Sequence, residues 1–273
     1  MPELPEVETI RRGLLKTVKG KRIKAITVLL PKMVRRHASP NEVTRRARGK
    51  VVVDIRRRGK TLLFFLDSRD VLIFRLGMTG QMLWSHPKAM LKKDKYTHVI
   101  IDFGKRERVL FRDMRQFGEV YITTESHLEK VLAMGAEPLE EGFSLGTLKQ
   151  ITSSSMRIKQ LLMDQRKIAG IGNIYSDEIL FVAGIHPLKP ADALKRKELL
   201  LLHRAIGAIL NEAITRKGDT IGQYRDLFGE SGGYQEVHRV YQRCDEPCYR
   251  CGSLIRRIKL AGRSCHFCPS CQK

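Results

Sequence analysis

The sequence predicts a multidomain α+β protein with a leading helix, an N-terminal β-sandwich, a helical C-terminal region and a four-cysteine metal finger. Short β-type runs fill residues 23–122, helical periodicity follows from residue 144, and all six cysteines lie between Cys244 and Cys271. These observations predict an N-terminal domain over 1–135, a linker over 136–150, a helical domain over 151–235 and the finger over 236–273.

The first helix is predicted to start at Leu4 and to stop at Gly20. Pro5 suits the first turn of a helix, and a glycine is a common stop signal. The apolar residues recur at helical spacing and are Val7, Ile10, Leu14 and Val18. This helix would hold the N-terminus of the chain against the rest of its domain.

Seven short runs with β-type composition follow the first helix. Turn signals such as Arg58-Gly59-Lys60 separate several of them, which is typical of a sandwich or barrel. The runs are 23–28, 50–55, 61–66, 71–74, 98–103, 109–111 and 119–122.

The pattern changes to helices after an acidic stretch with proline and glycine near residues 136–143. Helices are predicted over 144–152, 157–165, 173–183, 191–217 and 221–226, and residues 229–233 are predicted to form a loop.

Two Cys-x-x-Cys pairs are the strongest local signal in the chain. Their spacing matches a four-thiolate zinc ribbon, in which the closed ligand set makes the metal structural. The predicted ligands of one zinc ion are Cys248, Cys251, Cys268 and Cys271. Disulfides and an iron–sulfur site are the alternatives, His266 is an alternative ligand, and Cys244 and Cys265 are surplus.

The charge of the chain indicates a polyanionic partner. Lys and Arg number 51 against 29 Asp and Glu, a net charge of +22. Nucleic acid is the first candidate and an anionic membrane surface the second. No apolar run reaches the roughly 20 residues needed to span a bilayer, and no signal peptide is evident. We therefore expect a soluble, intracellular protein.

The N-terminal proline is a candidate nucleophile. Removal of Met1 would leave Pro2 with a secondary amine that is partly neutral at physiological pH and could attack a sugar C1′. Glu3 could donate and accept protons in this reaction. Lys60 lies at the end of a basic turn. The alternative interpretation is that the N-terminal proline is unreactive and that Lys60 is an ordinary solvent-exposed lysine.

Several motifs, taken in order, resemble those of bacterial formamidopyrimidine-DNA glycosylase, which has a helix–two-turn–helix element in its helical domain. The motifs are Met1-Pro-Glu-Leu-Pro-Glu-Val-Glu-Thr9, Leu76-Gly-Met-Thr-Gly80, Asp113-Met-Arg-Gln-Phe-Gly118, Ala169-Gly-Ile-Gly-Asn-Ile-Tyr175, Ala183-Gly-Ile-His-Pro187 and, at the finger, Gly262-Arg-Ser and Phe267-Cys-Pro-Ser-Cys-Gln272. The opening Glu-Leu-Pro-Glu differs from the Glu-Gly-Pro-Glu typical of the sister endonuclease VIII group.

The resemblance implies an enzyme of base excision repair that flips oxidised purines out of duplex DNA, excises them and nicks the strand by β,δ-elimination. It implies that Pro2 is the Schiff-base nucleophile and Glu3 the general acid and base. Lys60 matches a proton donor in β-elimination, and Arg263 matches a finger arginine linked to phosphate binding and δ-elimination.

The resemblance also implies a set of DNA contacts. Met78, Arg115 and Phe117 would fill the space that the flipped base leaves. The remaining DNA-binding residues would be Tyr96, Arg157, Lys159, Asn173 and Tyr241. We expect a monomer that binds damaged double-stranded DNA, without a membrane or an organic cofactor, in the bacterial cytoplasm at the nucleoid.

Some positions depart from the family pattern and leave two alternatives open. Arg75 and Tyr96 replace histidines, and Ser155 replaces a basic residue. Departures also occur at Val240-Tyr-Gln-Arg and in the loop 218–224 that caps the flipped base. The alternatives are an endonuclease VIII-type enzyme for oxidised pyrimidines and a non-catalytic protein that binds damaged DNA.

Overall fold

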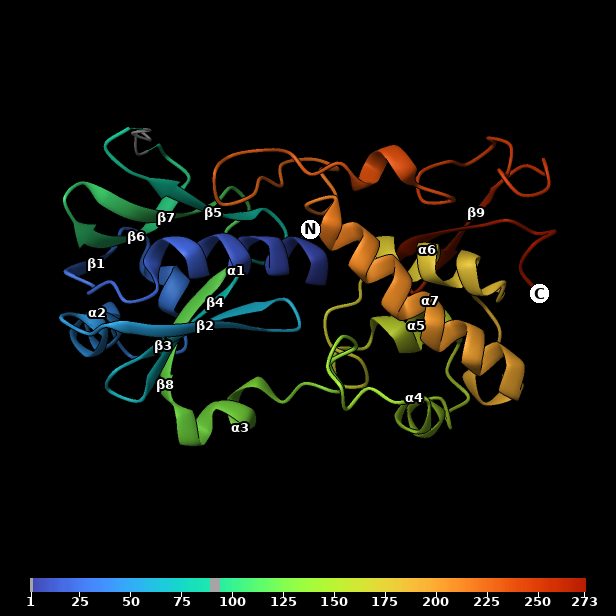
Figure 1. The fold of residues 1–273 in the computed structure, drawn as a ribbon, viewed down its shortest axis with the longest axis horizontal. Helices are drawn as coiled ribbons and strands as arrows, with labels where there is room; N and C mark the ends of the chain where they lie inside the picture. Colours follow the sequence, from blue (N-terminus) through green and yellow to red (C-terminus); the bar gives the residue numbers. More distant parts are fainter. Residues whose placement is uncertain (1, 89–93) are drawn as a thin grey trace. The chain divides into compact units, whose positions relative to one another are not determined.

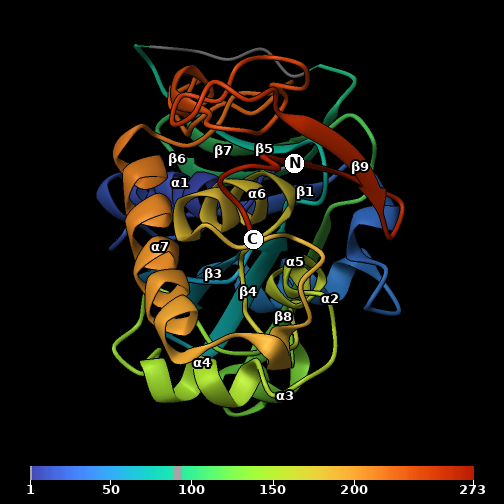
Figure 2. The same ribbon diagram turned by 90° about the vertical axis from the view of Figure 1, so that its right-hand side faces the viewer.

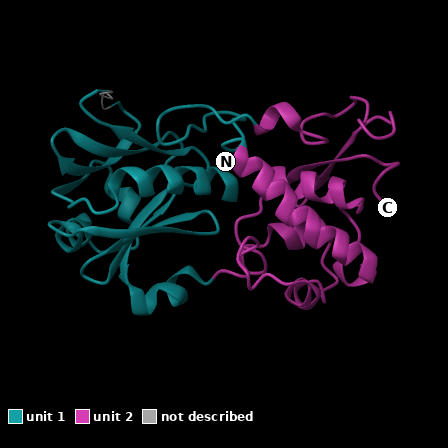
Figure 3. Cartoon of the chain, in the orientation of Figure 1, with its two compact units in different colours: residues 1–133, 216–233 teal, residues 134–215, 234–273 magenta. Residues whose placement is uncertain are grey.

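A computed structural model describes residues 2–88 and 94–273 of the chain (Figure 1). The chain forms two compact units (Figure 3). The first unit contains residues 1–133 and 216–233, and the second contains residues 134–215 and 234–273. Residues 216–233 thus group with the N-terminal part of the chain, although the sequence alone assigned them to the helical domain.

The first unit consists of helix α1 (Leu4–Val18) and two four-stranded antiparallel sheets, which confirms the predicted sandwich. The strand orders are β1-β6-β7-β5 and β2-β3-β4-β8. The strands are β1 (Ala25–Val28), β2 (Val52–Arg58), β3 (Thr61–Leu66), β4 (Asp70–Arg75), β5 (Gly80–Ser85), β6 (Thr97–Gly104), β7 (Glu107–Asp113) and β8 (Glu119–Thr124).

The core of the first unit joins the two sheets and the apolar face of α1. The ring centroids of Phe64 and Phe74 lie 5.4 Å apart, and those of Phe74 and Phe111 lie 5.6 Å apart. Phe74 belongs to one sheet and Phe111 to the other, so this contact spans the sandwich. The predicted helical stripe of α1 is fully buried, and each such side chain contributes about 1.5–3 kcal/mol.

Strand β5 and helices α2 (Pro40–Ala47) and α3 (Leu128–Leu132) were not predicted. Strand β5 starts directly at Gly80, so the turn motif before it concealed the strand. Helix α2 has a recognisable start, because the hydroxyl of Ser39 accepts a hydrogen bond from the N–H of Asn41 at 3.2 Å and Pro40 follows it.

The segment 216–233 is bonded to strand β5 instead of forming the predicted helix over 221–226, so that prediction is wrong. The N–H of Trp84 donates to the carbonyl of Leu227 at 2.8 Å, and the side-chain amide of Gln81 donates to the carbonyl of Gln223. Gly222 has a φ of +90°, which also interrupts a helix. These backbone groups therefore bond to the sheet and not to each other.

The second unit consists of helices α4 (Leu145–Ile151), α5 (Ile158–Met163), α6 (Asn173–Ala183) and α7 (Arg196–Thr215), followed by the strands β9 (Arg256–Leu260) and β10 (Arg263–Phe267). Helix α6 packs against α7 (Figures 1 and 2), and strand β10 packs against α6. Helix α6 ends where Gly184 adopts a φ of +71°.

The predicted helix over 191–217 divides into a short 3-10 turn, Ala191–Ala193, and α7. The buried residues of α7 follow helical spacing and include Leu199, Leu202, Ile206 and Ile209. Within the described ranges, none of the helices has the length and apolar character that crossing a membrane requires.

Candidate functional site

Pro2 and Glu3 are buried at the start of α1, where the carboxylate of Glu6 holds the backbone of Glu3 in place. Glu6 Oε2 accepts the N–H of Glu3 at 2.7 Å, and Glu6 Oε1 accepts the N–H of Asp219 at 2.7 Å. The hydroxyl of Tyr224 lies 3.4 Å from the carbonyl oxygen of Glu6. The buried Glu6 carboxylate therefore joins the helix start to the segment 216–233. Met1 lies outside the described residues.

Lys60 lies in the tight turn between β2 and β3 in the same unit. Arg58 and Thr61 pair on either side of this turn, and Gly59 takes a φ of +52°. Next to the turn, Arg57 Nε lies 3.3 Å from the carboxylate of Glu8 on α1. The Arg57 side chain is 5% exposed, so the ion pair attaches the hairpin to the helix that carries Pro2.

Met78, Arg115 and Phe117 lie on two neighbouring loops of the first unit. Met78 is 40% exposed and Phe117 is 50% exposed, although both are large apolar residues. The guanidinium carbon of Arg115 lies 4.9 Å from the centre of the Phe117 ring. A Cβ on Gly77 would lie 2.9 Å from the backbone nitrogen of Gly118, so the two loops are in close contact.

Asp113 joins these two loops, and the sequence analysis did not select it. Its Oδ1 accepts a hydrogen bond from the hydroxyl of Thr79 at 2.5 Å, and its Oδ2 accepts the N–H of Gly118 at 2.7 Å. The N–H of Arg115 donates to the Thr79 hydroxyl oxygen at 2.9 Å. The signal that could have found it is an aspartate at the start of a turn, where its carboxylate accepts from following N–H groups.

Tyr96 is half-buried beside the segment 216–233. It lines a pocket of about 400 Å³ together with Met114, Gly222 and Gln223, all in the first unit. Its carbonyl accepts the N–H of Asp113 at 2.9 Å, which ties the Tyr96 loop to the loop of Arg115 and Phe117.

Arg263 is exposed at the turn between β9 and β10 in the second unit. Ala261 and Gly262 both have positive φ angles, +48° and +76°, which make the turn tight. The other basic residues of the hairpin, Arg256, Arg257 and Lys259, are also exposed. The hairpin therefore presents four exposed basic side chains on one strand pair.

Asn173 is the first residue of α6, where the positive end of the helix dipole favours an anion. Its Nδ2 lies 3.5 Å from Ser264 Oγ, and its Oδ1 is buried without a hydrogen-bond partner among the described residues. Arg157, which precedes α5, is exposed. Both remain predicted DNA contacts.

Tyr241 is held by Glu178, a buried residue of α6 that the sequence analysis did not select. The Glu178 carboxylate accepts the backbone N–H groups of Arg239, Val240 and Tyr241 at 2.9–3.0 Å. The ring of Tyr241 lies edge-on to that of His266 with centroids 5.1 Å apart. This predicted DNA contact therefore sits on a fixed backbone segment.

Lys159, which the resemblance gives as a DNA-binding residue, is buried in the second unit. Its side chain is 2% exposed, and its Nζ donates to Asp177 Oδ1 at 2.7 Å and to the carbonyl of Ser264 at 2.8 Å. Its contact with a phosphate stays a prediction.

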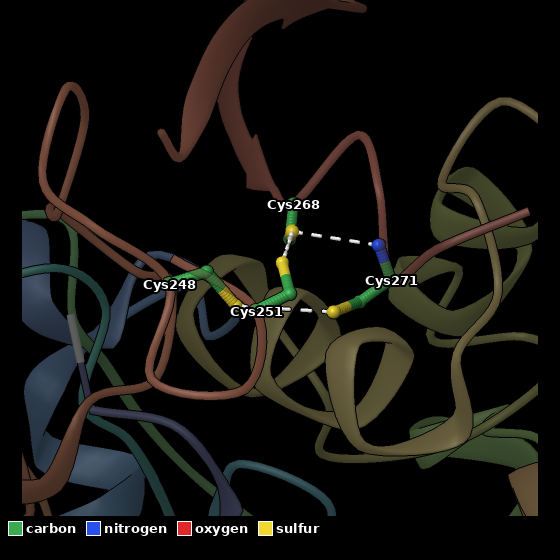
Figure 4. A group of neighbouring side chains, drawn as sticks. All are labelled: Cys248, Cys251, Cys268 and Cys271. Atoms are coloured by element: carbon green, nitrogen blue, oxygen red, sulfur yellow. Dashed lines mark hydrogen bonds between the residues drawn. The ribbon is translucent and has the colours of Figure 1, made fainter. Parts of the chain in front are cut away.

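The four predicted zinc ligands come together in the finger (Figure 4). All four sulfur atoms lie within 4.8 Å of one another, a spacing that suits tetrahedral thiolate coordination. N–H groups of Arg250 and Cys271 donate to the sulfurs of Cys248 and Cys268, each at 3.4 Å. None of the four cysteines forms a disulfide, so the disulfide alternative is wrong.

The other two cysteines and His266 lie outside this group. Cys265 is buried, and burial, followed by the Asp177 charge, raises the pKa of its thiol. A hydrogen bond to Asp245 raises the pKa of Cys244. The ring of His266 faces Asp177, with Nδ1 3.2 Å from Oδ2, so the alternative of His266 as a ligand is wrong.

Three family models match consecutive parts of the chain. The Formamidopyrimidine-DNA glycosylase N-terminal domain matches residues 1–120, the Formamidopyrimidine-DNA glycosylase H2TH domain residues 134–225, and the zinc finger found in FPG and IleRS residues 245–273. The formamidopyrimidine-DNA glycosylases of Geobacillus kaustophilus and Carboxydothermus hydrogenoformans are 40% and 42% identical, and each match covers 100% of both chains.

The chain belongs to the formamidopyrimidine-DNA glycosylase family. The resemblance and the fold class predicted from the sequence are thereby confirmed, and the four cysteines form the zinc site of the family finger.

Solved structures of the family superpose closely. The Lactococcus lactis enzyme in complex with an abasic-site DNA has a TM-score of 0.91 at 35% identity and 99% coverage of both chains. A mutant of that enzyme with a Fapy-dG-containing DNA has a TM-score of 0.92 at 36% identity and 100% coverage of both chains.

Proposed function

We propose that Pro2 is the nucleophile of a DNA glycosylase that excises oxidised purines from duplex DNA and then cleaves the strand. After removal of Met1, the secondary amine attacks C1′ of the damaged nucleotide. The N–C1′ bond forms, the glycosidic bond breaks, and the base leaves with a proton. Opening of the sugar ring gives an iminium ion, which acidifies the C2′ proton. Its loss expels the 3′ phosphate, and a second elimination expels the 5′ phosphate.

The other three catalytic residues have separate roles in this proposal. Glu3 exchanges protons during base loss and ring opening. Lys60 donates a proton during β-elimination, and Arg263 binds the phosphate and supports δ-elimination. The observation that carries the proposal is the buried start of α1, where the Glu6 carboxylate holds the N–H of Glu3 at 2.7 Å and so presents Pro2 and Glu3 from a rigid element.

Borohydride trapping tests this assignment. The protein, incubated with an 8-oxoguanine:cytosine duplex and borohydride, should form a covalent adduct, because the reductant converts the iminium ion to a stable amine. A Pro2→Gly variant should fold and lose most of this adduct. Intact mass must show that Met1 is absent, since a retained Met1 would leave the Pro2 nitrogen acylated. A preparation that binds duplex DNA, lacks Met1 and gives no adduct would exclude the lyase mechanism.

Oxidised purines are the substrate class that the family supports. The Lactococcus lactis structures contain abasic-site DNA and Fapy-dG-containing DNA. A panel that compares 8-oxoguanine, formamidopyrimidine and thymine glycol separates this substrate class from that of an endonuclease VIII-type enzyme. A non-catalytic binding protein would instead bind an abasic-site duplex and leave the strand uncut.

In the proposal, Met78, Arg115 and Phe117 fill the space that the flipped base leaves. Their large exposed surfaces support this role, because an apolar wedge and an aromatic ring can replace lost stacking. Variants with alanine at Met78 or Phe117 should excise 8-oxoguanine from duplex DNA more slowly. They should still nick a single-stranded abasic oligonucleotide.

In the proposal, Tyr96, Arg157, Asn173 and Tyr241 contact the DNA, and Arg263 binds a phosphate. The net charge of +22 supports binding that weakens steeply with salt. We also propose a monomer that acts at the nucleoid in the bacterial cytoplasm. Sedimentation of the free protein and of its complex with one duplex would test the monomer.

A further inference from the structure

Lys159 and Asp177 form a buried ion pair in the second unit. The side chain of Lys159 on α5 is 2% exposed and that of Asp177 on α6 is 0% exposed. Lys159 Nζ lies 2.7 Å from Asp177 Oδ1. Burying two charges is costly unless each is paired and hydrogen-bonded. The stability of this pair therefore depends on the further hydrogen bonds that Lys159 and Asp177 each make.

The further hydrogen-bond partners of Lys159 and Asp177 both lie on strand β10 of the finger hairpin. Lys159 Nζ donates to the carbonyl of Ser264 at 2.8 Å. Asp177 Oδ2 accepts the backbone N–H of His266 at 2.9 Å and lies 3.2 Å from the Nδ1 of its ring. One cation and one anion from two helices therefore bind consecutive polar groups of the same strand.

These groups lie on the strand edge that faces away from β9. Ser264 and His266 are alternate residues, so their backbone groups point to the same edge, and β9 bonds to the other edge. The ion pair thus bonds to backbone groups at the edge of β10 where a third strand could otherwise pair. Cys265, which lies between them, is 0% exposed, so this part of the hairpin is fixed on both sides.

Arg263 directly precedes Ser264 on this fixed strand and is exposed at the turn. Its backbone position is therefore set by the bond from Lys159 to the next residue.

We propose that Asp177 and Lys159 are positioning residues that place Arg263 for cleavage on the 5′ side of the lesion. The inference rests on the proposed function of Arg263. It gives Lys159 an internal role in place of a direct phosphate contact, because two of its three N–H donors are used inside the protein.

The test uses the full-length, zinc-loaded protein on a duplex with a preformed abasic site. Asp177→Asn and Lys159→Met each break the pair, and the double variant Lys159→Met/Asp177→Leu replaces it with apolar side chains of similar size. Asp192→Asn is the matched control, because Asp192 is an exposed acid in the same unit. The readouts are the β- and δ-elimination products under single-turnover conditions, the borohydride adduct, the zinc content and the melting temperature.

Asp177→Asn should lower the rate of δ-elimination about 10- to 100-fold, because a small displacement of a catalytic group has effects of this size. Adduct formation and zinc content should stay within about twofold of wild type, as expected if Pro2 chemistry and the metal site are intact. The double variant should recover the melting temperature, since apolar replacement of a buried ion pair is often neutral. It should not recover δ-elimination.

Three results would overturn the inference. The first is a double variant or Asp177→Asn variant with wild-type δ-elimination. The second is a δ-elimination loss that the double variant reverses together with the melting temperature. That result would show that the ion pair affects δ-elimination only through packing and stability. The third is a salt dependence of DNA binding that weakens by about one counterion in Lys159→Met but not in Asp177→Asn, which would mark a phosphate contact. Arg263→Gln is the reference: if it cleaves normally, the proposed role of Arg263 itself fails.

Discussion

Replacement of Asp113 should disable the two loops that carry Met78, Arg115 and Phe117 without touching those residues. Asp113→Ala removes the acceptor of the buried Gly118 N–H and of the Thr79 hydroxyl. An unsatisfied buried donor costs about 1–3 kcal/mol, and the lost hydrogen bond of the half-exposed Thr79 adds about 1 kcal/mol, so the total is about 2–4 kcal/mol. For a unit of this size, the melting temperature should fall by roughly 4–16 °C.

The functional effect of Asp113→Ala should depend on the substrate. Excision of 8-oxoguanine from a duplex should slow about tenfold for each 1.4 kcal/mol lost from loop support. Borohydride trapping on a single-stranded abasic oligonucleotide should change by less than about twofold, because no orphaned base needs support. Thr79→Val should share part of the defect, and Thr79→Ser should not.

Asp67→Ala is the control, since Asp67 is an exposed acid in the same unit. The reasoning is refuted if Asp113→Ala melts at the wild-type temperature. It is also refuted if duplex excision and single-strand trapping fall by equal factors, which would indicate general loss of the active fold.

Three further predictions concern other parts of the chain. Cys248→Ser should reduce the zinc content from about one ion per chain to none and weaken DNA binding by unfolding the finger, because zinc supplies about 10–16 kcal/mol in such sites. Elemental analysis measures the zinc, and titration with duplex DNA measures the binding. The control Cys244→Ser should change neither the zinc content nor the DNA affinity. Burial raises the pKa of Glu8, but hydrogen bonds from Arg11 and Arg12 outweigh burial, and the net pKa is lowered from 4.5. This stabilisation is present at neutral pH and is lost as the pH falls below 4.5, so wild type should be more stable than Glu8→Gln at pH 7 and the two melting temperatures should converge in acid. Gly77→Ala should cost about 1–3 kcal/mol, because φ is +66° and the new Cβ would meet the backbone of Gly118 at 2.9 Å; Gly207→Ala, with open space around it, should be neutral or stabilising in the same melting assay.

The sequence was sufficient for elements whose pattern is local. The stripe of α1, the strands around buried residues such as Phe64 and Phe74, and the cysteine pairs follow from periodicity and spacing alone. Strand β5 was missed because a glycine turn precedes it directly, and a local reading takes the whole stretch as a turn. The segment 216–233 was misassigned because its partners Gln81 and Trp84 are far away in the chain.

The site shows the same division between local and distant information. The reactive and DNA-contacting residues of the motifs were selected, but the carboxylates that hold them were not, although Glu6 and Asp113 lie in the same motifs. Glu6, Asp113, Asp177 and Glu178 each accept backbone N–H groups, and for Glu6, Asp177 and Glu178 some of these donors lie more than 60 residues away. Such a bond leaves no pattern in the acceptor's own neighbourhood, so an ordinary acidic residue and a structural one look alike in a single sequence.

The first unit is discontinuous in the chain, and this affects how the protein can be dissected. A fragment that ends at residue 133 would lack residues 216–233, which belong to the same unit. The Trp84 N–H would lose its acceptor, the Leu227 side chain would no longer cover Gly13, and Glu6 would lose the N–H of Asp219. A usable fragment would need those 18 residues grafted back through a short linker, so simple truncation is a poor route to an isolated N-terminal domain.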